Sequence, residues 1–189
     1  VGDLLYVADI TCIRMFDRAS GDAAGEICWD DVVFLNDLAS DGEGNLYVSD
    51  SGVGDGSDAV YRVTQGGERS VVVAGAELGG PNGLVADDRG VFVATYGSGE
   101  IFRITPEGQR VNLAPPSEMG LDGLVSLEDR GFLFSSWGDS AVYWVDSEGQ
   151  LTTLIPDIPS PADMGYDADR NRVLVPVFRE NRLVIREVR

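Results

Sequence analysis

The sequence predicts an all-β fold, a β-propeller built of four-stranded antiparallel blades. A four-residue motif recurs every 40–45 residues or so, the blade period of such propellers. After each copy come a polar turn and a short apolar strand, and no helical periodicity intervenes. The copies are Leu35-Asn36-Asp37-Leu38, Pro81-Asn82-Gly83-Leu84, Leu121-Asp122-Gly123-Leu124 and Pro161-Ala162-Asp163-Met164.

The strand pattern predicts that residues 1–189 form a single propeller domain. Three complete blades are expected at about 32–77, 78–117 and 118–157, with an incomplete first blade at 1–31 and an incomplete last blade at 158–189. That amounts to about four and a half blades of a six-bladed type. Because a propeller closes on itself, we expect either missing N-terminal sequence or an unusual closure by these two ends.

Within each blade the apolar runs predict which strands are buried. Second strands such as Val91-Phe92-Val93 and Phe132-Leu133-Phe134 are continuously apolar, as expected for strands covered on both faces by neighbouring blades. The fourth strands contain Arg69, Arg110 and Gln150, which is typical of a solvated outer edge.

The composition excludes several classes of function. The chain has 32 acidic and 14 basic residues, a net charge of −18, which would repel nucleic-acid phosphates. No apolar run approaches the roughly 20 residues needed to span a bilayer, so no membrane insertion is expected. The absence of His removes the commonest zinc ligand and any Ser-His-Asp triad. We expect a monomer.

The two cysteines, Cys12 and Cys28, fall nearly opposite each other on neighbouring strands. Two alternatives remain open, a disulfide or two buried free thiols. A disulfide would suit an exported protein, so a periplasmic or extracellular location is favoured over a cytoplasmic one.

The candidate site follows from the repeat. Asn36, Asn82 and Asp122 occupy equivalent positions in consecutive blades, at the start of innermost strands that converge on the propeller axis. Two amide oxygens and a carboxylate form a hard ligand set that favours a divalent cation, most of all Ca²⁺. Asp122, or a second carboxylate, would then take the proton from a water molecule bound to the cation. Asp163 lies one residue beyond the fourth equivalent position and is expected to point elsewhere, but it remains a candidate for the second carboxylate.

Simpler interpretations exist for the same residues. Asn-Gly and Asp-Gly pairs are turn signals, which a repeat protein needs at the same place in every blade. Tyr96 and Trp137, with Phe178, follow the second strands; they would wall a substrate pocket or pack between blades.

Over its whole length the chain resembles the senescence-marker-protein/gluconolactonase/luciferin-regenerating-enzyme family of six-bladed propellers. The matching segments are Phe34-Leu35-Asn36-Asp37 with Asp41, Pro81-Asn82-Gly83-Leu84, Leu121-Asp122-Gly123, and the second strands with the residues after them, 45–51, 95–100 and 135–140. The resemblance implies metal-dependent hydrolysis of lactones or related esters. It makes Asn36 a residue that faces substrate or metal, Asn82 a metal ligand, and Asp122 both a ligand and a base.

Two family positions differ here. The family's metal-binding Glu would lie before Val1, and its substrate-orienting Arg is replaced by Phe34. The leading hypothesis is a metal-dependent, lactonase-like hydrolase acting on a small-molecule lactone or ester. The alternatives are a non-catalytic propeller that binds a partner on its top face, and a fragment with the fold but no working site.

Overall fold

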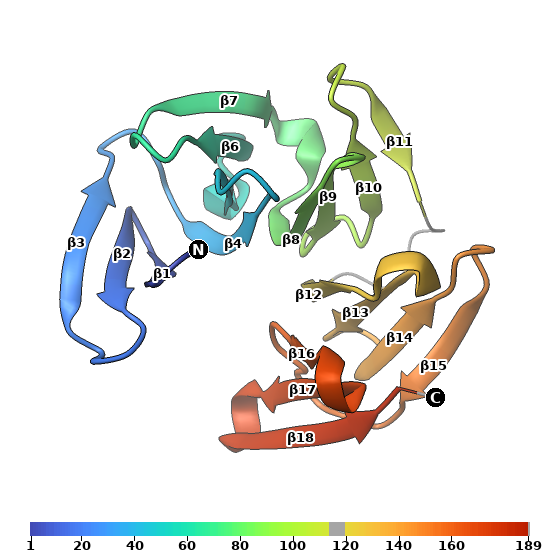
Figure 1. Cartoon of the computed structure of the whole chain (residues 1–189). Helices are drawn as coiled ribbons and strands as arrows, with labels where there is room; N and C mark the ends of the chain where they lie inside the picture. Colours follow the sequence, from blue (N-terminus) through green and yellow to red (C-terminus); the bar gives the residue numbers. More distant parts are fainter. Residues whose placement is uncertain (114–119, 189) are drawn as a thin grey trace.

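A computed structural model describes residues 1–113 and 120–188 and confirms an all-β propeller. In the described residues, 18 strands form five antiparallel sheets, arranged as an arc around a common centre (Figure 1). The boundary expected between residues 117 and 118 lies outside the described residues. No helix in the described part of the chain has the length and apolar character needed to cross a membrane.

Each sheet is a meander whose strands pair in chain order. The strands are β1 (Leu4–Asp9), β2 (Cys12–Asp17) and β3 (Ala23–Cys28); β4 (Leu35–Ser40), β5 (Leu46–Asp50), β6 (Ala59–Val63) and β7 (Arg69–Ala74); β8 (Pro81–Asp87), β9 (Gly90–Thr95), β10 (Ile101–Ile104) and β11 (Arg110–Asn112); β12 (Leu121–Ser126), β13 (Phe132–Ser136), β14 (Ala141–Val145) and β15 (Leu151–Ile155); β16 (Gly165–Asp167), β17 (Arg172–Val177) and β18 (Arg182–Glu187). Short 3-10 turns lie between some of them: η1 (Gly52–Gly54), η2 (Ala76–Leu78), η3 (Glu128–Arg130), η4 (Ala168–Arg170) and η5 (Phe178–Glu180).

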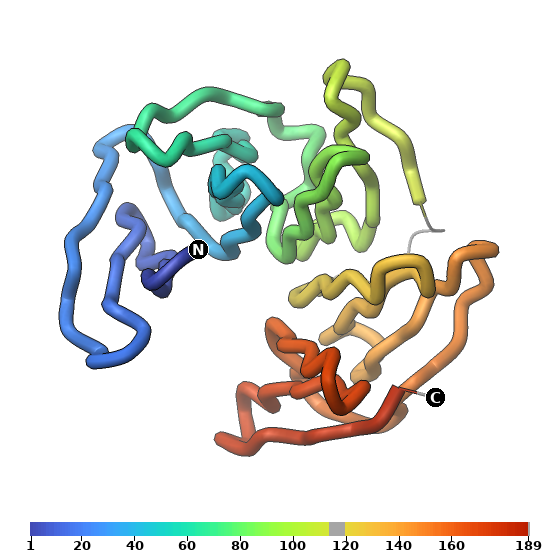
Figure 2. Tube along the Cα trace, in the orientation of Figure 1, coloured from blue at the N-terminus to red at the C-terminus, as the bar shows by residue number. Residues whose placement is uncertain are grey.

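The blade count corrects the expectation from the sequence. The chain has five small blades of three or four strands, not four and a half blades of a six-bladed ring. The reason is that each three-stranded sheet, β1-β2-β3 and β16-β17-β18, forms a blade of its own. These two blades lie at the two ends of the arc, blue and red in Figure 2.

Blades pack through their inner strands, as the apolar runs predict. β1 packs against β4, β4 against β8, and β8 against β12. A core cluster joins the second and third blades through Val60, Leu84, Val93 and Phe102. The outermost strand β11 is exposed along its whole length. Burial between blades therefore holds the arc together.

The structure resolves the alternative left open for the cysteines. Cys12 and Cys28 are directly opposite in the β2–β3 register and form a disulfide. The bridge spans a sequence separation of 16 residues. Closing a loop of this size removes on the order of 3 kcal/mol of unfolded-state entropy, which stabilises the first blade.

The innermost strands of the three four-stranded blades share a β-bulge. The register of each against its second strand shifts between Leu35 and Leu38, between Pro81 and Leu84, and between Leu121 and Leu124. The bulge brings each inner strand close to the next blade. A Cβ placed on Gly83 would overlap the Asp122 carbonyl oxygen and lie 2.8 Å from Leu124 N. Only glycine fits there.

We therefore predict that Gly83→Ala destabilises the propeller by roughly 1–3 kcal/mol, because the added methyl must push two inner strands apart. Gly42→Ala is the control, since a Cβ there meets nothing within 4 Å. Urea unfolding of the two variants measures the difference. Equal midpoints for Gly83→Ala and the wild type would contradict the close approach of these strands.

Candidate functional site

The bulges position the predicted site residues. Asn82-Gly83 and Asp122-Gly123 lie inside β8 and β12, so these pairs do not form the turns that the simpler interpretation proposed. A bulge redirects a side chain out of the regular alternation of its strand. Asn36 lies at the matching place in β4.

Buried serines on the second strands hold two of the bulges. Ser49 Oγ accepts a hydrogen bond from Asp37 N at 3.0 Å and donates to Asn82 O at 2.8 Å. Ser135 Oγ repeats this arrangement two blades later, accepting from Gly123 N at 2.8 Å and donating to Ala162 O at 3.1 Å. Ser49 thus ties its bulge to the inner strand β8 of the following blade, and Ser135 ties its bulge to the segment just before β16.

Four of the predicted residues line one pocket of about 580 Å³: Asn36, Asn82, Tyr96 and Trp137. Its walls also include Phe34 and Val53, and it is mainly apolar with a few polar groups, as small-molecule sites commonly are. Asp122 is not among the residues that line this pocket. Burial raises the pKa of its carboxyl, and the adjacent Trp137 indole N–H only partly offsets this rise. That N–H has no hydrogen-bond partner among the described residues.

The two aromatic walls are held by backbone hydrogen bonds within their own blades and by one bond between the blades. Tyr96 N donates to Gly80 O at 2.8 Å, and Trp137 N donates to Gly120 O at 2.8 Å. Gly120 N in turn donates to Tyr96 O at 2.6 Å, which links the two loops. The rings meet edge to face, with centroids 5.8 Å apart. Both predicted roles, pocket wall and packing between blades, therefore apply to these rings.

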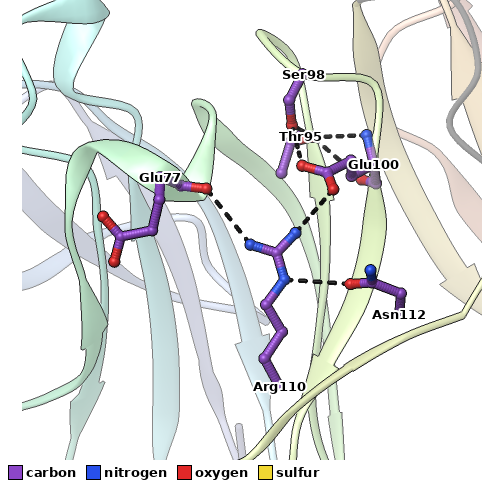
Figure 3. Close-up of polar contacts among 6 residues, drawn as sticks. All are labelled: Glu77, Thr95, Ser98, Glu100, Arg110 and Asn112. Atoms are coloured by element: carbon purple, nitrogen blue, oxygen red, sulfur yellow. Dashed lines mark hydrogen bonds and ion pairs between the residues drawn. The ribbon is translucent and has the colours of Figure 1, made fainter.

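The turn that bears Tyr96 is braced from outside by Arg110 of β11 (Figure 3). Its guanidinium forms an ion pair with Glu100 at 3.0 Å and donates to Asn112 Oδ1 at 3.2 Å. Glu100 accepts from Ser98 Oγ at 2.8 Å, and Ser98 Oγ lies 2.8 Å from Thr95 Oγ1. This network closes the β9–β10 turn and so fixes one wall of the pocket.

The amide of Asn36 has a defined orientation. Ser51 Oγ donates to Pro81 O at 2.7 Å, so it must accept from Asn36 Nδ2, which lies 3.2 Å away. The amide nitrogen is thereby used, and the oxygen of Asn36 is the atom left for a ligand. The sequence analysis predicts an oxygen atom at this position that binds a cation or substrate.

Three carboxyl groups interact near the axis: Asp37, Asp122 and Asp163. Burial, followed by repulsion from Asp163, raises the pKa of Asp122 to about 7. Burial and then the charges of Asp163 and Asp122 raise the pKa of Asp37 well above its ordinary value. The pKa of Asp163 is also raised by burial. None of the charges that shift these three pKa values is positive.

Asp37 is a functional candidate that the sequence analysis missed, whereas Asp163 is kept there as a candidate carboxylate. The expectation that Asp163 points elsewhere is wrong, because its charge acts on both Asp37 and Asp122. Asp37 Oδ2 accepts from Leu84 N of the next blade at 2.6 Å, and Asp163 Oδ1 accepts from Met164 N at 2.8 Å. The available signal was that both residues hold the third position of the repeated motif, where Gly83 and Gly123 stand in other blades.

The predicted cation site can be tested against these donors. In the described residues, no three Cys, Asp or Glu side chains are grouped so that they could hold a metal ion. A cation would therefore need the amide oxygens of Asn36 and Asn82 beside the Asp122 carboxylate. Among the described residues, the Asn36 oxygen accepts no side-chain or backbone hydrogen bond and no positive charge shifts the pKa of the three carboxyls, which fits such a hard cation.

We predict that Asp122→Asn stabilises the fold at pH 8 in the presence of a chelator. A carboxyl whose folded pKa is raised favours folding while both states are protonated, and this stability is lost as pH rises through the folded pKa. The variant should match the wild type near pH 4 and exceed it by on the order of 2–4 kcal/mol at pH 8. Urea unfolding at both pH values measures this. A variant less stable than the wild type at pH 8 would contradict the uncompensated burial of Asp122.

Comparisons with known proteins support the propeller fold. No protein-family model and no curated protein matches the chain. A catalytically inactive virginiamycin B lyase from Staphylococcus aureus, solved with quinupristin, is similar with a TM-score of 0.75 and 13% identity over 98% of this chain. A chain of a nidogen/laminin complex has a TM-score of 0.75 and 18% identity, covering 98% of this chain and 78% of its own length.

A Bacteroides thetaiotaomicron protein of unknown function is also similar, with a TM-score of 0.77 and 15% identity over 99% of this chain. The chain spans 63% of the length of the lyase and 57% of the length of the Bacteroides protein. At these identities the likeness establishes a β-propeller and no more.

Proposed function

We propose that this propeller is a hydrolase that opens a small lactone or a related ester, with Asp122 as the acid–base group. The observation that carries the proposal is a buried carboxyl whose pKa is raised to about 7, next to a wall of the 580 Å³ pocket. General acid–base groups work best when their pKa lies near the working pH. Strong shifts of this kind cluster at functional sites.

The reaction assigns one task to each group. The Asp122 carboxylate takes a proton from a water molecule as the water oxygen attacks the ester carbonyl carbon. The bond between that carbon and the ring oxygen then breaks, and the leaving alkoxide takes the proton back from Asp122. Asn82, whose side chain lines the pocket with only 5% of its surface exposed, can hydrogen-bond the substrate. Phe34, Tyr96 and Trp137 shield the reacting ester from bulk water.

A divalent cation, most of all Ca²⁺, is part of the proposal. Asn36, Asn82 and Asp122 would hold it, and its chemistry would be to polarise the ester carbonyl and acidify a bound water. A cation in this place would also supply the positive charge that the three carboxyls lack. It would lower the pKa of Asp122, since a positive charge nearby favours the ionised carboxyl.

The solved structures do not choose between enzyme and binding module. One similar chain is called a lyase and another belongs to a nidogen/laminin complex, and one fold hosts many functions. The raised pKa of Asp122 favours the enzyme, since a surface for protein partners needs no buried neutral carboxyl. The non-catalytic module stays the alternative.

We predict that Asp122→Asn lowers kcat/KM for lactone opening by about 10²–10⁴-fold, because the amide cannot accept the proton. Asp129→Asn, on an exposed turn, is the control and should be unchanged. In the presence of a chelator, wild-type kcat/KM should rise with pH around a midpoint near 7. Added calcium should move that midpoint down if Asp122 is a ligand. A panel of aliphatic and sugar lactones, followed by pH-stat titration, measures these rates.

Two results would decide against parts of this proposal. Activity retained in Asp122→Asn would remove Asp122 from the reaction. A pH profile that calcium leaves in place would remove the cation and leave the metal-free acid–base mechanism.

A further inference from the structure

We propose that Arg179 and Trp137 form a subsite for a carboxylate on the substrate, so that the preferred substrate is an anionic lactone or ester. This inference rests on the proposed function and deepens it. It concerns a second compartment of about 440 Å³ that the sequence analysis did not distinguish from the first.

The second compartment adjoins the pocket described above. Tyr96, Gly97 and Trp137 line both, so the two share a wall. Among the described residues lining the second compartment, Arg179 is the one charged side chain, and no carboxylate is present. In a chain with 32 acidic and 14 basic residues, a cavity with a cation and no carboxylate is suited to an anion.

The guanidinium of Arg179 is available. It stacks over the Trp137 ring, 5.4 Å from the centroid, and forms no ion pair within the described residues. Arg172 and Arg182, in the same blade, each pair with a carboxylate. Stacking leaves the N–H groups at the rim of the guanidinium free to donate to a ligand.

Arg179 is also held in place from its backbone. Arg179 N donates to Ser160 Oγ at 3.2 Å, and Phe178 N donates to Ser160 O at 3.0 Å. Ser160 is 5% exposed and lines the compartment, as does Ser140. Phe178 packs on Trp137 with centroids 5.5 Å apart. The turn η5 is therefore docked on the loop before β16, and little ordering is needed when a ligand binds.

These features specify the ligand. A planar guanidinium fork pairs with a carboxylate through two parallel hydrogen bonds, and hydroxyls add further donors. The faces of Trp137 and Tyr96 suit an apolar body. Because Tyr96 and Trp137 line both compartments, the proposal places the carboxylate of the substrate at Arg179 and its ester in the adjoining pocket.

Binding of two matched probes tests the subsite without requiring turnover. Phenylacetate and phenylacetamide differ in charge but have nearly the same shape. Ligand-observed NMR titration measures the dissociation constant of each probe. The titration uses about 0.1 M salt, at which charges more than ~10 Å away are screened. Wild type should bind phenylacetate about tenfold more tightly than the amide. Arg179→Gln should lose this preference, and Arg179→Lys should keep part of it. Arg182→Gln, which removes a nearby ion-paired cation, should keep all of it.

The proposal is overturned if wild type binds neither probe, binds both equally, or keeps its preference in Arg179→Gln. A kinetic arm separates this inference from the proposed function, using a γ-lactone that bears a carboxylate and the corresponding amide. Lactone opening without preference for the charged substrate overturns the subsite and leaves the hydrolase. An Arg179-dependent preference in binding, with neither lactone opened, supports the subsite and overturns the hydrolase.

Discussion

The close approach of neighbouring inner strands determines where every candidate functional group lies. Each bulge shifts its strand toward the next blade. At Gly83, backbone atoms of β12 then occupy the space that a side chain on this residue would need. Ser49 and Ser135 supply the hydroxyls that satisfy the amides freed by the bulge. The residue just before the glycine is therefore turned out of the regular sheet pattern, and the equivalent residues Asn36 and Asn82 of successive blades line one pocket.

That geometry has an electrostatic consequence. Asp37, Asp122 and Asp163 come from three different blades, yet each lies where burial or a neighbouring carboxylate disfavours its charge. No Arg contributes to the pKa shifts of these three carboxyls, so their negative charge can be neutralised by protons or balanced by a bound cation. Both possibilities suit a reaction in which a proton leaves water and reaches a leaving group. The apolar packing that stabilises the blades thus also leaves these carboxyl groups poorly solvated.

The repeat in the sequence predicted much of this and left specific gaps. Equivalence of Asn36, Asn82 and Asp122 followed from spacing, and so did the placing of Tyr96 and Trp137 at the ends of second strands. The direction of side chains did not follow, because a single bulged residue changes which face a side chain takes. For that reason Asn82-Gly83 looked like a turn and Asp163 looked remote. Arg179 could not be found from sequence, since its role depends on being unpaired, which only packing reveals.

Site-resolved titration of the carboxyl carbons by NMR, in the presence of a chelator, tests the convergence of these blades most directly. The account predicts that the Asp122 carboxyl titrates near pH 7 and that Asp163→Asn moves its midpoint down, because a repelling charge is removed. An Asp122 midpoint near the ordinary value of 3.8, unmoved by Asp163→Asn, would show that the inner strands do not bring these side chains together.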